Sequence, residues 1–157
     1  MAVIAYSNRW NRVTRQPQDT LEESKAEKLH RLRRPYVALI ERADGDLTVV
    51  EMCFTDVYCN VLFLDQWKRV ANRYSFKKVK DGQVFLTEAV VHQYASEEAP
   101  LPSSGELFRF RTDGSVTHET GESSGEALLR EGQTDVSANF AAEPRFGSYE
   151  SVARRER

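Results

Sequence analysis

The sequence has no long apolar run. Its 157 residues include no stretch near the roughly 20 apolar residues that a membrane-spanning helix needs. The opening residues, MAVIAYSNRWNRV, have too short an apolar stretch for a signal peptide, and their basic residues follow that stretch instead of preceding it. We therefore expect a cytoplasmic protein that has no membrane partner.

Cysteine and histidine are scarce, with 2 and 3 copies in the chain. A structural zinc site needs about four Cys or His ligands at short spacings, whereas His30, His92 and His118 stand singly and far apart. Two cysteines in a cytoplasmic chain also give no disulfide framework. We therefore predict no metal site and no cofactor.

Both cysteines lie in the segment TVVEMCFTDVYCNVLFLD, residues 48–65. A turn at residues 55–56 pairs Met52 with Cys59. Because side chains alternate along a strand, Cys53 then lies on the opposite face from Cys59. The two sulfurs can neither bond to each other nor share a metal. We predict that the segment is a core hairpin in which both thiols are buried as small apolar groups.

Familiar catalytic motifs are absent from the sequence. No GxSxG, HExxH, P-loop or GxGxxG string occurs. A cysteine nucleophile needs a base within hydrogen-bond distance, and His92 and His118 fall on predicted strands where structural roles are expected. Scattered carboxylates can still meet in a fold, but the close pair Glu97 and Glu98 lies in a loop rich in Pro and Ser. We predict that the protein is not an enzyme.

Charge is distributed unevenly along the chain. Residues 97–150 carry 11 acidic and 4 basic side chains, whereas residues 1–36 carry 4 acidic and 8 basic ones. An acidic segment of this size repels phosphate and suits a basic partner, although acidic loops also keep proteins soluble. Two segments, SNRWNRVTR and QWKRVANRYSFKK, interleave aromatic and basic residues as nucleic-acid binders do. Their alternation favours aromatic side chains that pack inward, so nucleic acid is not the expected partner.

One helix is predicted, over residues 19–34. Asp19 or Thr20 can cap its start, acidic residues follow in its first turn, and Pro35 ends it. Its apolar positions form a narrow stripe, which is typical of a helix that lies on another element.

After Pro35 the apolar period changes to two, which indicates strands. Asp-Gly pairs at 44–45, 81–82 and 113–114 stand between alternating runs, and this is the strongest short-range signal of a β-hairpin. The predicted strands span residues 36–43, 46–54, 57–64, 67–80, 83–95, 106–111 and 115–120. A short strand or helix is expected at 127–131, and one more strand is expected near the end.

These elements predict an α+β fold, with a mostly antiparallel, curved β-meander sheet and one main helix packed on it. The chain shows no linker that would divide it, so residues 1–157 form a single domain. Within it we expect an N-terminal strand and basic segment, the helix, a β-rich body and a charged tail, at residues 1–18, 19–34, 36–149 and 150–157.

The segment EPRFGSYESV, residues 143–152, lies near the end of the chain. This segment is similar to FG-x-Y-x-S endings among the small cytoplasmic immunity proteins that accompany bacterial polymorphic toxins. The compact size, the β-meander with one helix and the acidic face also resemble that group. The resemblance implies a protein that inhibits a cognate toxin by occluding its active site, with an acidic surface meeting a basic cleft.

A partner-binding face of this kind would use carboxylates and aromatic side chains of the last third. The candidates are Glu97, Glu98, Glu106, Asp113, Glu119, Glu122, Glu126, Phe146 and Tyr149. Aromatic residues beside charged ones are typical of protein interfaces, but these aromatic side chains can equally close one end of the sheet. The alternative is a small-ligand-binding protein or enzyme that uses the concave face of the sheet, with Asn60, Glu88 and His92 as inward-facing polar residues.

Overall fold

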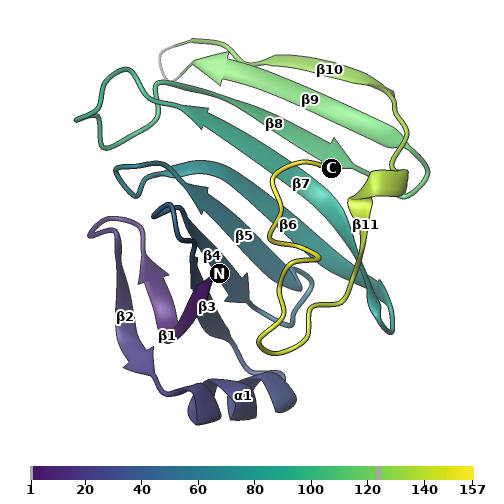
Figure 1. Cartoon of the computed structure of the whole chain (residues 1–157). Helices are drawn as coiled ribbons and strands as arrows, with labels where there is room; N and C mark the ends of the chain where they lie inside the picture. The colour runs from purple at the N-terminus through teal and green to yellow at the C-terminus, as the bar shows by residue number, and fades with distance from the viewer. Residues whose placement is uncertain (1, 123–124) are drawn as a thin grey trace.

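The computed structural model describes residues 2–122 and 125–157. Within these residues, eleven strands form one curved sheet, accompanied by one α-helix and one short 3-10 helix (Figure 1). The strands are β1 (Val3–Asn11), β2 (Gln16–Leu21), β3 (Tyr36–Glu41), β4 (Leu47–Met52), β5 (Cys59–Leu64), β6 (Val70–Lys80), β7 (Gln83–Gln93), β8 (Ser104–Phe110), β9 (Ser115–Glu122), β10 (Leu128–Gln133) and β11 (Phe140–Ala142). The helices are α1 (Glu23–Arg31) and η1 (Ser137–Asn139).

The sheet is an antiparallel meander from β3 to β10, which pair in chain order. β1 pairs with β3, and β2 lies outside β1 at one edge. The Asp-Gly pairs turn the chain between β3 and β4, β6 and β7, and β8 and β9. Gly45, Gly82 and Gly114 there have φ angles of 86°, 80° and 92°, which a residue with a Cβ adopts only with strain. The predicted antiparallel sheet is confirmed.

After β10 the chain returns to the middle of the sheet. β8 pairs with the second half of β7, from Glu88 to Gln93, and β11 pairs with its first three residues, so that Phe140 lies opposite Phe85. β11 therefore continues the position of β8 along the same side of β7. This return brings the C-terminal segment onto the sheet.

The predicted start of the helix, at residue 19, is wrong, because the helix begins at Glu23. Asp19 and Thr20 lie in β2, so neither caps the helix. The helix begins only after Glu22, which makes no side-chain cap hydrogen bond. Leu21 is buried as a strand residue opposite Tyr6 of β1, so strand pairing outweighs the local helix signal. The helix is a minor part of the fold, and no helix of the described residues is long and apolar enough to cross a membrane.

The hairpin of β4 and β5 has the predicted register, with Met52 opposite Cys59. Its turn is less regular than predicted, because the backbone N–H groups of Cys53 and Phe54 both donate to the carbonyl oxygen of Tyr58. Cys59 is buried, Cys53 is half-buried, and both are free thiols. Burial raises the pKa of each thiol, so neither is a ready nucleophile at neutral pH.

The sheet buries apolar side chains on both faces. One face, which we call the tail face, carries Val61 and Phe63 and is covered by α1 and by the C-terminal segment, including Tyr149. The other, which we call the hairpin face, carries Trp10 and Leu62. Neighbouring residues of one strand thus enter two separate cores, as the alternation of side chains requires.

The β1–β2 hairpin folds over the hairpin face. β1 pairs with β3 only as far as Ser7, and beyond that point Trp10 joins the cluster that contains Leu62. At the tip of the hairpin, Nη1 of Arg15 donates to the carbonyl oxygen of Trp67 at 3.2 Å. The tip therefore contacts the turn between β5 and β6, and the β1–β2 hairpin becomes one wall of the hairpin face.

The C-terminal segment crosses the tail face (Figure 1). Tyr149 and Val152 are 1% and 0% exposed. The Tyr149 hydroxyl lies 2.8 Å from that of Tyr36, and the Tyr36 hydroxyl lies 2.8 Å from Nδ1 of His30. This chain of hydrogen bonds joins the C-terminal segment, β3 and α1 through a buried polar network, in which each hydroxyl has a partner.

We expect His30 to make the stability of the protein depend on pH. Burial, followed by the neighbouring Arg33 guanidinium, lowers the pKa of His30. An unfolded chain takes up the proton near pH 6.5, whereas the folded chain takes it up only at lower pH. The free energy of unfolding should therefore fall as pH drops from 7 to 5, by at most about 1.4 kcal/mol per pH unit for one proton.

Urea unfolding at pH 5, 6, 7 and 8 measures this dependence. His30→Gln should show a shallower slope than the wild type below pH 7. The lowered pKa values of His92 and Glu143 add slope of the same sign, and both groups are present in the wild type and in the variant. Equal slopes for the wild type and His30→Gln would contradict the prediction.

Candidate partner-binding site

Strands β8, β9 and β10 form an extension of the sheet that is open to solvent. Every residue of β10 is exposed, and most residues of β8 and β9 are half-buried. In the described part of the chain, β10 pairs only with β9, so its outer edge is free. Free edges with exposed backbone N–H and C=O groups are places where a partner can add or cover a strand.

An acidic groove runs between β7, β8 and β9 near the start of β10. Its volume is about 470 Å³. Its lining residues are Val91, Gln93, Ser104, Gly105, Glu106, Thr120, Gly121, Glu122, Glu126 and Leu128. Three of these are glutamates and, among the described residues, none is Lys or Arg. We call this feature the acidic groove; it favours a positively charged group.

A close approach of two strands shapes the floor of the acidic groove. Gly105 of β8 lies opposite His92 of β7, and a Cβ at Gly105 would sit 2.8 Å from the carbonyl oxygen of Val91. Such a contact is too short for a real side chain, so the position requires glycine. A side chain at Gly105 would point to the face that carries His92, so the glycine brings the backbones of β7 and β8 together beneath the groove.

Glu106 is held by a neighbouring ring. Its Oε1 lies 3.1 Å from Nε2 of His118, and the imidazole stacks on Phe108 with 4.2 Å between ring centres. Glu106 is 40% exposed, so its carboxylate is oriented and still open to solvent. No three His, Cys, Asp or Glu side chains among the described residues could hold a metal ion together.

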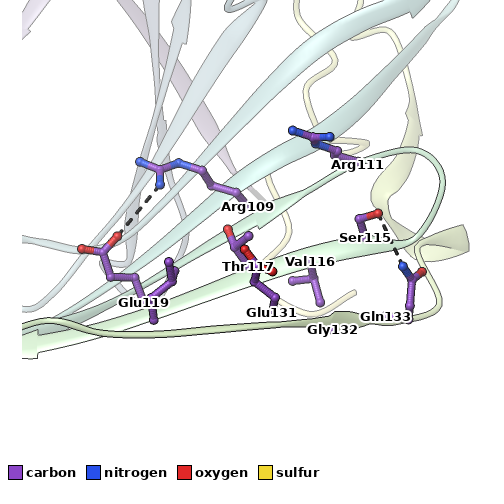
Figure 2. Close-up of a pocket in the computed structure, with 10 residues that line it drawn as sticks. Arg109, Arg111, Ser115, Val116, Thr117, Glu119, Glu131, Gly132 and Gln133 are labelled. Atoms are coloured by element: carbon purple, nitrogen blue, oxygen red, sulfur yellow. Dashed lines mark hydrogen bonds and ion pairs between the residues drawn. The ribbon is translucent and has the colours of Figure 1, made fainter.

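Glu119, another predicted contact residue, lies on the opposite face of the extension. It pairs with Leu107, and its Oε2 lies 3.9 Å from Nη1 of Arg109. Figure 2 shows these two side chains turned toward each other. They line a pocket of about 700 Å³, whose lining also includes Arg111 and Glu131. This pocket mixes both signs of charge, so Glu119 does not belong to the acidic groove.

The remaining predicted carboxylates lie away from the groove. Asp113 lies in the β8–β9 turn, at the far end of these strands, and accepts a hydrogen bond from the backbone N–H of Ser115 at 2.8 Å. The hydrogen bond with the Ser115 side chain, followed by this backbone hydrogen bond, lowers the pKa of Asp113. Glu97 and Glu98 are exposed in the β7–β8 loop. Of the seven predicted carboxylates, Glu106, Glu122 and Glu126 line the acidic groove. Glu119 lines a separate pocket of about 330 Å³ that Glu106 and Glu122 also border.

The two predicted aromatic contact residues face inward. Tyr149 is 1% exposed, so a partner cannot reach it in this structure. Phe146 is half-buried and stacks on Tyr6 with 5.0 Å between ring centres. The apolar surface of the acidic groove is supplied instead by Leu128, which is 54% exposed. Leu129 pairs with Glu119 and lines the pocket of mixed charge on the opposite face. The sequence signal for Leu128 is the adjacent pair of leucines between Glu126 and Arg130, in the segment 127–131 where a short strand or helix is expected.

The polar residues named for the ligand-binding alternative do share one face. Asn60, Glu88 and His92 lie on the hairpin face of β5 and β7. The Ser75 hydroxyl donates to Oδ1 of Asn60 at 2.7 Å, and Nη2 of Arg73 donates to Oε1 of Glu88 at 2.6 Å. The hairpin face is therefore apolar under the β1–β2 hairpin and polar beyond it.

Searches against protein-family models, curated proteins and solved structures give no match to this chain.

Proposed function

We propose that the protein binds a protein partner through the acidic groove and blocks it. The observation that carries the proposal is the convergence of Glu106, Glu122 and Glu126 on one groove whose lining, among the described residues, has no cation. Exposed Leu128 beside the groove adds an apolar contact to the charged ones. Interfaces of this composition use charge for encounter and apolar side chains for retention.

The partner we propose is a cognate toxin with a basic active-site cleft. The ending EPRFGSYESV and the small β-meander, which resemble immunity proteins, support this choice. A basic side chain of the toxin would enter the acidic groove, and the body of the β8–β10 extension would cover the cleft. Inhibition would be steric, because it needs only that substrate and inhibitor compete for the same surface. The inhibitor itself would perform no chemistry.

The change that tests the proposal is the triple variant Glu106→Gln, Glu122→Gln and Glu126→Gln. It removes three charges and keeps the shape of each side chain, so it should slow association at low salt by about tenfold or more. The tagged wild type, expressed in its native cells, should retain one stoichiometric protein that mass spectrometry identifies. The purified partner should then lose its toxic activity on addition of the wild type, and keep it on addition of the triple variant.

A matched control is Glu27→Gln, Glu41→Gln and Glu156→Gln, which removes the same charge from exposed sites outside the groove. This control should bind and inhibit like the wild type. Equal loss of binding in both triple variants would show that net charge, and not the groove, attracts the partner. Co-purification of a small molecule or a nucleic acid without any protein partner would overturn the proposal.

A further inference from the structure

A second pocket lies on the hairpin face and has the opposite charge. It has a volume of about 310 Å³ and lies between the tip of the β1–β2 hairpin, the start of β6, the end of β7 and the β7–β8 loop. Its lining residues are Arg12, Val13, Arg15, Arg69, Val70, Arg73, His92, Tyr94, Pro100, Leu101 and Pro102. We call it the arginine pocket.

The lining of the arginine pocket has four guanidinium groups and, within the described residues, no carboxylate. The acids that balance these cations lie outside the lining. Glu51 accepts from Arg12 at 3.0 Å, Asp65 from Arg69 at 2.8 Å and Glu88 from Arg73 at 2.6 Å. Arg15 has no carboxylate partner in the described part of the chain and donates to a backbone carbonyl. The carboxylates outside the pocket therefore hold these arginine side chains in position, while the pocket lining itself carries positive charge.

Two of the arginines are fixed before any ligand arrives. Arg69 is 6% exposed and donates from Nη1 to the carbonyl oxygens of Ser96 and Ala99 at 2.7 and 3.0 Å. Arg73 donates from Nη1 to Ser75 and from Nη2 to Glu88. Cations that are already positioned bind an anion without the entropy cost of ordering long side chains.

The pKa of His92 depends on the positive potential in the arginine pocket. It is half-buried, and its pKa is lowered first by burial and then by Arg73 and Arg12. At pH 7 the neutral imidazole has one N–H group that donates a hydrogen bond and one nitrogen that accepts one. An anion placed among the arginines would cancel part of their effect, so the pKa of His92 would rise when the pocket fills.

One wall of the arginine pocket is apolar. Val70 lies on its β6 side, and Pro100, Leu101 and Pro102 form its loop side. Leu101 is 76% exposed, so this wall continues to the mouth of the pocket. The Tyr94 ring lies under the Arg69 guanidinium, with 4.0 Å from Cζ to the ring centre, and its hydroxyl donates to the Val70 carbonyl oxygen at 2.8 Å. The pocket thus joins a cationic end to an apolar side.

We propose that the arginine pocket binds a small organic anion, with its carboxylate, sulfate or phosphate head among Arg12, Arg15 and Arg73 and its apolar body against Val70 and residues 100–102. Guanidinium groups suit all three heads because each head accepts paired hydrogen bonds. A volume of about 310 Å³ holds a ligand of the size of one substituted ring. This inference is independent of the partner proposed for the acidic groove, which lies on the other face.

Benzenesulfonate, inorganic sulfate and benzylammonium test the inference as probes. Benzenesulfonate keeps its charge at every pH used, so any change in affinity with pH belongs to the protein. It should bind more tightly than sulfate because of the apolar wall, and benzylammonium, with the same ring and the opposite charge, should not bind. Affinity is measured by NMR titration of the wild type at constant ionic strength.

The imidazole signals of the three histidines give a residue-specific readout. The His92 signal should shift on addition of benzenesulfonate and its pKa should rise, whereas the imidazole signals of His30 and His118 should keep their positions. Because the anion raises this pKa, its affinity should increase as pH falls from 8 to 5. A shift shared by all three histidines, or no shift of His92 on saturation, would overturn the proposal.

Matched variants locate the head group. Arg12→Gln with Arg15→Gln removes two cations from the exposed tip of the β1–β2 hairpin and should weaken benzenesulfonate binding by about tenfold or more, since each lost pair is charge-assisted. Arg31→Gln with Arg145→Gln removes the same charge from exposed sites elsewhere and should leave affinity unchanged. Circular dichroism checks that both variants are folded. Unchanged binding in the first pair, or equal loss in both, would count against the site.

Discussion

Replacing Tyr149 with Ala is expected to lower the free energy of unfolding by about 3 to 5 kcal/mol, as for other buried aromatic residues. Tyr149 is 1% exposed and fills the centre of the tail face with Val152 and Phe63. The substitution leaves a cavity and removes the hydrogen bond to Tyr36. The C-terminal segment should loosen as well, because Tyr149 and Val152 are its most deeply buried residues on the sheet.

Urea unfolding of Tyr149→Ala, Tyr149→Phe and Phe146→Ala measures the separate contributions. Tyr149→Phe keeps the ring and should cost only about 1 kcal/mol for the lost hydrogen bond, because Tyr36 keeps its contact with His30. Phe146→Ala truncates a half-buried ring and should cost less than Tyr149→Ala. A Tyr149→Ala variant as stable as the wild type but unable to bind a partner would show that Tyr149 acts at the surface, against its burial here.

Most of the sheet could be predicted from the sequence because its signals are local. Asp-Gly between alternating runs specifies a tight hairpin, and three such pairs fix the pairing of six strands in three hairpins. The register of β4 and β5 follows from the length of the turn between Met52 and Cys59. The predicted and observed strand bounds agree to within a few residues. The largest differences lie next to turns, because backbone hydrogen bonding, and not the side-chain pattern, sets where a strand ends.

The parts that were not predicted depend on contacts between distant residues. The segment around Asp19 has both strand and helix signals, and pairing with β1 decides between them. Trp10 could be placed on a strand, but nothing local indicates that the β1–β2 hairpin bends over Leu62. Tyr149 looks like a surface residue beside charged neighbours, and its burial depends on the path of the whole C-terminal segment across the tail face.

The same distinction applies to the two candidate sites. The three glutamates of the acidic groove lie within 21 positions of each other, with Glu106 and Glu122 on neighbouring strands and Glu126 just before β10, so an acidic segment predicts their proximity. The four arginines of the arginine pocket come from two segments that are more than 50 residues apart. Arg69 and Arg73 look like part of a solvated basic strand until the fold places Arg12 and Arg15 over them. Alternation alone cannot reveal that proximity.

Replacing Arg69 with Ala is expected to destabilise the protein by about 3 to 5 kcal/mol, the usual effect of breaking a buried ion pair. Its Nε donates to Oδ2 of Asp65 at 2.8 Å, and its Nη1 donates to three carbonyl oxygens of the β7–β8 loop, including those of Ser96 and Ala99. The side chain also lies between the rings of Trp67 and Tyr94. Removal would leave an unpaired carboxylate and three acceptors without their donor.

Two control variants separate charge from geometry at this position. Arg69→Lys keeps the cation but cannot reach Asp65 and the loop at once, so it should recover only part of the lost stability. Arg12→Ala breaks an ion pair whose arginine is 52% exposed, and it should cost at most about 1 kcal/mol. Urea unfolding gives the stabilities, and amide hydrogen exchange in residues 94–103 gives the order of the loop.

Amide hydrogen exchange in the β7–β8 loop tests whether Arg69 also shapes the arginine pocket. If Arg69 anchors the β7–β8 loop, Arg69→Ala should speed exchange of the Ser103 amide, which donates to the carbonyl oxygen of Gln93 at 2.8 Å, and should weaken benzenesulfonate binding together with it. Equal stability of Arg69→Ala and Arg12→Ala, with unchanged exchange, would mean that the loop is held by its own turns. The position of the apolar wall of the arginine pocket would then not depend on Arg69.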